Sequence, residues 1–141
     1  MIAIWLAMVV ARGTAFSCTP VAVWDGDGPI WCKEGPRIRL AGIAAREIDE
    51  TCKTGHPCPT SSGRAARDGL VELLGGARGM LPSGHIRVRS AALRCVSDGG
   101  GGGNRTAAWC RTSTGLSLNC AMVSAGLAAR WDPYWRRARC P

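Results

Sequence analysis

The chain has 141 residues, enough for one domain with a single modest core and for one site rather than several. Its formal net charge is +8, and all but two of its 18 basic residues are arginines, the exceptions being Lys33 and Lys53. Because a guanidinium grips phosphate through two parallel hydrogen bonds, this bias points to a polyanionic partner. The charge alone is equally compatible with a solvated cationic surface, so it does not identify the partner.

An apolar stretch opens the chain at residues 2–10, and small residues follow at Gly13 and Ala15. The run is too short for a transmembrane helix, which needs about 20 apolar residues. Its small-residue end is typical of a signal-peptidase site. We therefore expect residues 1–15 to be a cleaved signal peptide and residues 16–141 to form the domain, with an uncleaved interfacial anchor as the alternative.

Three short strands are predicted next. Residues 21–24 and Ile30–Cys32 flank a turn rich in Asp, Gly and Pro, which predicts a hairpin. A second turn leads into Arg37–Leu40, where charged and apolar residues alternate as in a half-buried strand. Three strands in succession favour a meander.

A helix is predicted after a loop at residues 51–60 that is rich in Pro, Gly and Cys. Ser61 or Ser62 is a suitable N-cap, and the glycine pair 75–76 is a suitable C-terminal stop. The apolar face of this helix is made of Leu70, Val71 and Leu74.

The second half of the chain completes the predicted fold. Residues 85–93 are expected as a strand and residues 106–110 as its hairpin partner, across a glycine run at 99–103 that we expect to be mobile. A second helix is predicted at 117–127 and a third from Asp132 onward. This pattern predicts an α+β fold, a five-stranded OB-type β-barrel with about three helices, a platform that commonly binds single-stranded nucleic acid.

Eight cysteines lie beyond the expected leader, and an even set in so short a chain predicts up to four disulfides. We therefore expect a disulfide-stapled protein that is periplasmic or secreted. The alternative is zinc bound by Cys52, His56 and Cys58, although the spacing lacks the CxxC pairs of structural zinc sites. The expected pairs are Cys52 with Cys58, which closes a short loop, Cys95 with Cys110 on the predicted hairpin, and, by elimination, Cys18 with Cys32 and Cys120 with Cys140.

Four short motifs, taken in their order along the chain, contain the candidate catalytic residues. They are Asp25-Gly26-Asp27 in the first hairpin, Arg39-Leu40-Ala41-Gly42-Ile43 with Glu47 after it, Asn104-Arg105, and the run 118–128. Taken singly, each has an ordinary structural interpretation as a turn, a solvated strand charge or a loop acid. In this order and spacing, and over nearly all of the chain beyond the leader, they resemble the staphylococcal nuclease (thermonuclease) family.

The resemblance implies a phosphodiester hydrolase that acts on DNA and/or RNA with calcium. It makes Arg39 and Arg105 the phosphate-gripping arginines and Glu47 the group that activates or orients the attacking water. It makes Asp27 a calcium ligand, and Ala45 can add its backbone carbonyl. Attack on a phosphodiester builds negative charge on the equatorial oxygens, which two guanidiniums and a divalent cation stabilise, while a carboxylate positions the water.

The sequence departs from the family pattern at the metal site. Ala44 stands where the family has a second calcium-ligating aspartate, and Gly28 stands where it commonly has threonine. Calcium prefers about six to eight oxygen ligands, so we expect the loss to weaken binding. A guanidinium at Arg46 is one candidate to replace the cation in part. The candidate replacement carboxylates are Asp25, Asp49 and Glu50.

Three function classes follow. The first is an exported nuclease that uses Asp27, Arg39, Glu47 and Arg105. Ala44 favours the second, a catalytically weakened or inactive nucleic-acid-binding or interaction module of the same fold. The third is a disulfide-rich cationic protein that acts on membranes or acidic polysaccharide. For the nuclease we expect nucleic acid as the partner, a monomer, and no stable membrane association after removal of the signal peptide.

Overall fold

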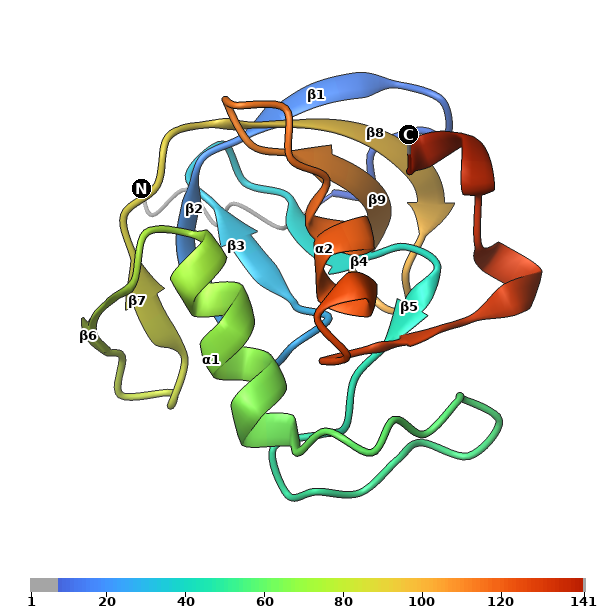
Figure 1. Cartoon of the computed structure of the whole chain (residues 1–141). Helices are drawn as coiled ribbons and strands as arrows, with labels where there is room; N and C mark the ends of the chain where they lie inside the picture. The colour runs from blue at the N-terminus through green and yellow to red at the C-terminus, as the bar shows by residue number, and fades with distance from the viewer. Residues whose placement is uncertain (1–7, 141) are drawn as a thin grey trace.

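Within residues 8–140, the part of the chain that this computed structural model describes, ten strands form two sheets (Figure 1). Eight strands make one curled, mixed sheet in the order β1-β8-β9-β4-β3-β2-β7-β6, and β10 pairs with β5 in a small second sheet. The strands are β1 (Ala15–Cys18), β2 (Pro20–Val23), β3 (Ile30–Cys32), β4 (Arg37–Leu40), β5 (Ile43–Ala44), β6 (Ala77–Met80), β7 (Ile86–Val88), β8 (Leu93–Gly100), β9 (Arg105–Arg111) and β10 (Ala129–Arg130).

The meander predicted at the start of the domain is confirmed. Strands β2, β3 and β4 pair antiparallel in sequence order, and β8 pairs with β9 as a hairpin across the glycine run. Part of that run belongs to the hairpin, because Gly99 and Gly100 lie in register with Ala107 and Thr106. The two halves of the chain are joined by a parallel pairing of β4 with β9.

The predicted five-stranded OB-type barrel with about three helices is wrong. The segment predicted as one strand at 85–93 is divided into β7 and the start of β8, because residues 89–92 turn the chain toward the other end of the sheet. Strands β6 and β1, which were not predicted, occupy the two ends of the strand order. The chain thus builds a wider, curled sheet in place of a five-stranded barrel (Figure 1).

Two α-helices occur in the described residues, α1 (Gly63–Leu73) and α2 (Leu118–Ser124). The cap predicted for α1 is confirmed, because the Ser62 side chain accepts from the Ala65 amide at 3.0 Å. Ser117, whose capping role was not predicted, caps α2 in the same way. The third helix predicted from Asp132 is only a single 3-10 turn, η1 (Asp132–Tyr134), followed by η2 (Arg137–Arg139). Trp131 at the cap position of η1 makes no side-chain cap bond, so nothing extends the turn into a helix.

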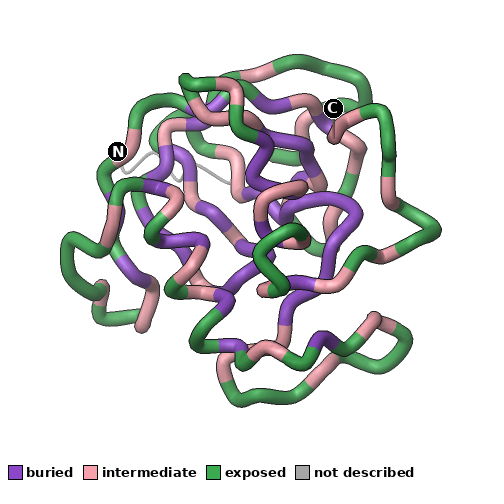
Figure 2. Tube along the Cα trace, in the orientation of Figure 1, coloured by how far each residue is buried: buried purple, intermediate pink, exposed green. Residues whose placement is uncertain are grey.

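The core lies on one face of the sheet. Ile38, Ile30, Val23 and Ile86 are neighbours in register across β4, β3, β2 and β7, and each is at most 8% exposed. Both helices cover this face with apolar side chains, and Figure 2 shows the buried segments running through the centre of the molecule. Because side chains alternate along a strand, the residues between these, Arg37 and Arg39 among them, belong to the other face.

Asn119 fixes α2 to the sheet beneath the site. Its side chain is fully buried, and Oδ1 accepts from the Cys110 amide at 3.1 Å. Its Nδ2 donates to the carbonyls of Ala41 at 2.9 Å and Ala108 at 3.0 Å. One amide thereby ties the helix to β9 and to the segment that leaves β4, so the two site-bearing strands are held in a fixed relation.

All four predicted disulfides are confirmed: Cys18 with Cys32, Cys52 with Cys58, Cys95 with Cys110, and Cys120 with Cys140. The zinc alternative is wrong, because both of its sulfur ligands are bonded to each other. Four disulfides indicate an oxidising environment, extracellular or periplasmic.

The expected leader lies partly outside the described residues, which begin at Met8. Its last part contacts the sheet: the Val10 amide donates to Oγ1 of Thr106 at 3.0 Å, and the Val10 carbonyl accepts from Oγ of Ser97 at 2.8 Å. Among the described helices, none has the length and apolar character to cross a membrane.

Candidate phosphodiester site

The four site residues predicted from the sequence come together in one pocket. Asp27, Arg39, Glu47 and Arg105 all line a cavity of about 190 Å³ at the end of the β2–β3 turn. They come from the turn, from β4, from the loop after β5 and from the start of β9. The parallel pairing of β4 with β9 brings Arg39 and Arg105, the two arginines of the pocket wall, onto neighbouring strands.

Arg39 is held firmly at the base of the pocket. It is only 8% exposed, and its Nη1 donates to the carbonyls of Leu40 at 2.9 Å and Ile43 at 3.0 Å. Its Nη2 lies 3.5 Å from Oδ2 of Asp27. The guanidinium is therefore fixed in place before any ligand arrives, which reduces the entropy lost when it binds an anion.

Asp27 bridges the turn and the loop after β5. Its Oδ2 accepts from the Ala45 amide at 3.0 Å as well as from Arg39. Ala45 thus presents its N–H to Asp27. The role predicted for that carbonyl stays a prediction.

Asp25 is a third carboxyl group in the pocket. Its Oδ1 accepts from the Asp27 amide at 3.2 Å, and the residue is only 3% exposed. Burial, and then the neighbouring carboxylate of Asp27, raise the pKa of Asp25 to about 10. Asp25 therefore carries a proton at neutral pH.

Two glycines set the shape of the turn that carries these acids. A Cβ at Gly26 would lie 2.5 Å from Cβ of Ala66 in α1, so the turn packs directly against the helix. Gly28 has a φ of +112°, and a Cβ there would collide with the carbonyl of Ile38. This backbone therefore requires glycine at residue 28.

Glu47 is positioned through its backbone. Its amide donates to the Thr51 carbonyl at 2.9 Å, and a Cβ on Gly63 would collide with the Glu47 carbonyl, so the first residue of α1 packs against it. Its Oε1 lies 4.0 Å from Nζ of Lys53. The carboxylate therefore stands at the rim of the pocket, next to a cation.

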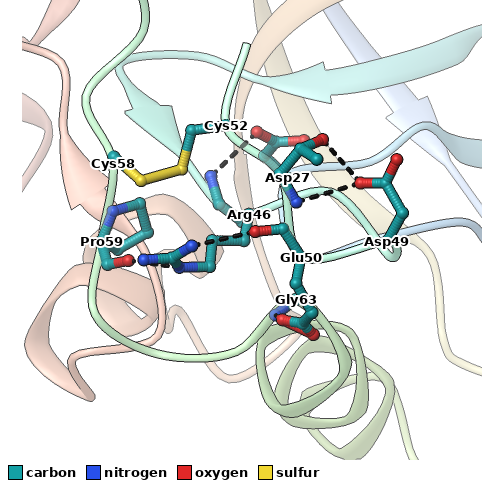
Figure 3. The surroundings of a disulfide bond; sticks show 10 residues. Asp27, Arg46, Asp49, Glu50, Cys52, Cys58, Pro59 and Gly63 are labelled. Atoms are coloured by element: carbon teal, nitrogen blue, oxygen red, sulfur yellow. Dashed lines mark hydrogen bonds between the residues drawn. A yellow bond between two sulfur atoms is a disulfide. The ribbon is translucent and has the colours of Figure 1, made fainter.

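The loop beside the disulfide of Cys52 and Cys58 accounts for three other predicted candidates (Figure 3). Arg46 donates from Nε to the Pro59 carbonyl at 2.8 Å and from Nη1 to the Glu50 carbonyl at 2.9 Å, which ties the loop together. The carboxylate of Glu50 accepts from the Gly63 amide at the start of α1. Asp49 accepts from the amide and hydroxyl of Thr51. Of the three candidate replacement carboxylates, only Asp25 lines the pocket.

The donor set fits calcium poorly. In residues 8–140 no group of three or more His, Cys, Asp or Glu side chains is placed to hold a metal ion. Ala44 contributes no carboxylate, one oxygen of Asp27 is occupied by Arg39 and Ala45, and Asp25 is protonated. Calcium needs about six to eight oxygens, several of them anionic, so these residues do not complete its shell.

Among the titratable residues that line the pocket, Lys53 and His56 were not predicted as part of it. Both lie in the loop closed by Cys52 and Cys58, which turns back over the pocket. The His56 ring stacks 4.1 Å from that of Trp131, and burial followed by the charge of Arg39 lowers its pKa. The short cysteine spacing was the available signal, because a closed seven-residue ring projects its side chains in fixed directions.

A larger groove of about 560 Å³ adjoins the pocket and shares four of its residues, Arg39, Lys53, His56 and Arg105. Its opposite wall is aromatic, and its floor includes the glycine run between β8 and β9. Trp131 lines the groove, and the Arg39 guanidinium lies 5.3 Å from its ring centroid. The aromatic residues of the groove are Trp131, Tyr134 and Trp135.

No family model, curated protein or solved structure matches the chain. The resemblance to the staphylococcal nuclease family therefore has no support from these comparisons, and the site has to be judged on its geometry.

Proposed function

We propose that the protein is an exported nuclease that hydrolyses phosphodiester bonds of DNA and/or RNA. The observation that carries the proposal is the convergence on one pocket of Asp27, Arg39 and Glu47 with Arg105, which comes from the second half of the chain. Two guanidiniums facing a carboxylate across a small cavity suit a phosphodiester, which is anionic and is attacked by water.

The reaction follows from the roles of these side chains. Glu47 takes a proton from a water molecule whose oxygen attacks phosphorus, and the bond from phosphorus to the leaving ester oxygen breaks. That oxygen takes up a proton from solvent. Arg39 and Arg105 bind the nonbridging oxygens, whose negative charge grows during attack, and Asp27 keeps Arg39 oriented.

Calcium, which the resemblance implies, stays a prediction, and no step above depends on it. The arginine pair and the general base act on the phosphate directly. A bound cation would add further charge stabilisation at the nonbridging oxygens.

The adjoining groove supports a nucleic acid as the substrate. Cationic side chains and aromatic rings line it together, and this combination suits a strand that has both phosphates and stackable bases. An acidic polysaccharide has saturated sugar rings and no aromatic bases, so it offers no π-stacking on Trp131 and Tyr134.

A second function is favoured by Ala44 and by the protonated Asp25. A chain that lost its metal ligands while keeping its arginines would bind nucleic acid without cutting it. This module would retain salt-dependent affinity for single strands, since phosphate contacts do not require catalysis.

The test uses the full chain, produced in an oxidising compartment so that the disulfides form. Cleavage of single-stranded DNA and of RNA is measured with calcium and with chelator, for the wild type, Glu47→Gln and Arg105→Gln. Glu72→Gln and Arg64→Gln are the matched controls, because both residues are exposed on α1 away from the pocket.

We expect each site variant to lose about 10²- to 10³-fold in rate while the controls keep wild-type rates. Cleavage that Glu47→Gln and Arg105→Gln leave unchanged would reject the proposed site. A folded wild type that binds single strands without cutting them would establish the binding module instead. Activity on anionic liposomes, with no binding of nucleic acid, would favour the membrane-active class.

A further inference from the structure

A row of residues crosses the face of the sheet that carries the pocket. Arg105 of β9 is the register partner of Arg37 of β4, which is opposite Trp31 of β3. Trp31 is opposite Ala22 of β2, and Ala22 is opposite Arg87 of β7. Directly opposed residues share a face, so this row runs from the pocket wall over about 19 Å of sheet, at roughly 4.8 Å per strand.

The positive charges in this row are not neutralised. None of Arg37, Arg87 and Arg105 forms an ion pair with any carboxylate within residues 8–140. Like charges directly opposite each other on neighbouring strands are destabilising, which applies to Arg37 and Arg105. A polyanion bound across this face would relieve the repulsion.

Aromatic rings are interleaved with these charges. The Arg37 guanidinium lies 4.5 Å from the Trp31 ring centroid, and the His85 ring lies 4.1 Å from Trp31 and 4.9 Å from Trp24. Together Arg37, Trp31, His85, Trp24 and Arg87 form what we call the outer strip. Apart from Arg87, which is exposed, its members are half-buried, so ring edges and guanidinium atoms remain accessible.

Packing alone does not account for this arrangement. The Nε1 of Trp31 is buried without a hydrogen-bond partner among the described residues, an uncompensated cost. His85 is placed by a 2.8 Å hydrogen bond between its Nδ1 and Oγ of Ser83, and burial followed by the charge of Arg37 lowers its pKa. The ring is therefore neutral at pH 7 and suited to stacking.

The outer strip is continuous with the pocket. Trp24, a member of the strip, lines the pocket, and Arg37 is the register partner of Arg105, which also lines the pocket. It leads across β3, β2 and β7, which lie side by side in the sheet, away from the groove of Trp131 (Figure 1).

We infer that the outer strip binds the single-stranded nucleic acid on the side of the pocket opposite the groove, its arginines contacting phosphates and its rings stacking on bases. The inference rests on the proposed function in one respect only, that the strand in the pocket is a nucleic acid. Its test measures binding and does not require cleavage. Alternation of cations and aromatic faces is the usual composition of single-strand paths.

The test measures binding of the full, disulfide-intact chain in chelator, by fluorescence anisotropy over a range of salt concentrations. The probes are a labelled dinucleotide, a single-stranded oligonucleotide of about 12 nucleotides, a span within the usual range of such sites, and polyphosphate of matching charge. The variants are Arg37→Gln, Arg87→Gln and their combination, neither residue lying in the pocket. Arg64→Gln on α1, at the opposite face of the sheet, makes the same change in charge.

We expect the double variant to bind the oligonucleotide more weakly and to lower the slope of log K against log salt by about 1.4, because each lost phosphate contact contributes about 0.7 for a single strand. Dinucleotide binding and the thermal unfolding temperature should match those of Arg64→Gln. Unchanged oligonucleotide affinity and slope would overturn the inference. So would an equal loss for dinucleotide and oligonucleotide, or polyphosphate binding as tight as that of the oligonucleotide.

The failure of the inference is distinguishable from the failure of the proposed function. If the wild type cuts no phosphodiester yet the double variant loses oligonucleotide affinity, the outer strip stands and the nuclease does not. If the wild type cuts and the variants bind as it does, the nuclease stands and the outer strip does not.

Discussion

The guanidinium of Arg39 lies 3.5 Å from the carboxylate of Asp27, with both side chains 10% exposed. Removing one charge of so buried a pair destabilises the folded protein, because solvent cannot replace the lost partner of the remaining charge. Asp27→Asn should therefore lower the free energy of unfolding by about 3 kcal/mol, measured by urea denaturation. Asp68→Asn is the control, since its pair with Arg67 involves a carboxylate that is 60% exposed. It should cost less than about 1 kcal/mol. Equal losses in the two variants would show that Asp27 does not hold Arg39.

Ala44→Asp should strengthen calcium binding at the pocket. A carboxylate at this position would join Asp27 and displace the proton of Asp25, which supplies the missing anionic oxygens. We expect calcium affinity to rise at least about tenfold, because the number of ligand charges tunes calcium binding over orders of magnitude. Isothermal titration calorimetry measures it, with Ala44→Asn as the uncharged control. An unchanged affinity would mean that residue 44 does not face the pocket acids.

Lys53→Gln should slow phosphodiester cleavage modestly. The lysine is half exposed and lies 4.0 Å from Glu47, so the pair contributes at most about 1 kcal/mol, or roughly a fivefold rate effect. Lys53→Arg should restore most of the rate. Lys33→Gln removes the only other lysine of the chain, in the turn between β3 and β4, and should leave the rate unchanged. If both glutamine variants slow cleavage equally, the effect is one of overall charge.

Stability should fall as the pH rises, because of Asp25. Its folded pKa of about 10 lies above its ordinary value of 3.8, so the folded state binds a proton that the unfolded state releases. This contribution is fully present below about pH 4 and is lost progressively as the pH rises toward about 10, by at most about 1.4 kcal/mol per pH unit. Asp25→Asn should flatten the dependence of unfolding free energy on pH between about 7 and about 9, where the histidines no longer titrate. The measurement is made in chelator, and identical slopes for variant and wild type would contradict it.

Local signals in the sequence were sufficient for part of this structure. The meander followed from alternation and turn residues, α1 from its serine cap, apolar face and terminal glycines, and the disulfides from an even cysteine count with short separations. The four site residues were predicted through the resemblance to the staphylococcal nuclease family, because no local pattern marks any one of them as functional.

Long-range pairing was not visible in the sequence. The parallel pairing of β4 with β9 joins segments more than 60 residues apart, and the residue pattern of neither strand identifies the strand it pairs with. The edge strand β6 is exposed at all four residues, so it shows no alternation of apolar and polar positions. Arg46 and Glu50 looked like candidates for the metal site, but a single arginine or glutamate serves equally well to tie a loop or cap a helix.

The contact of Gly26 with Ala66 has a consequence for engineering this protein. The acidic turn rests on a helix that contributes no functional side chain, with no space for even one extra methyl group between them. Small changes in the volume of residue 66 would shift Asp25 and Asp27 together relative to Arg39. Libraries directed at the face of α1 that packs against the turn would therefore retune the pocket without altering any residue that lines it.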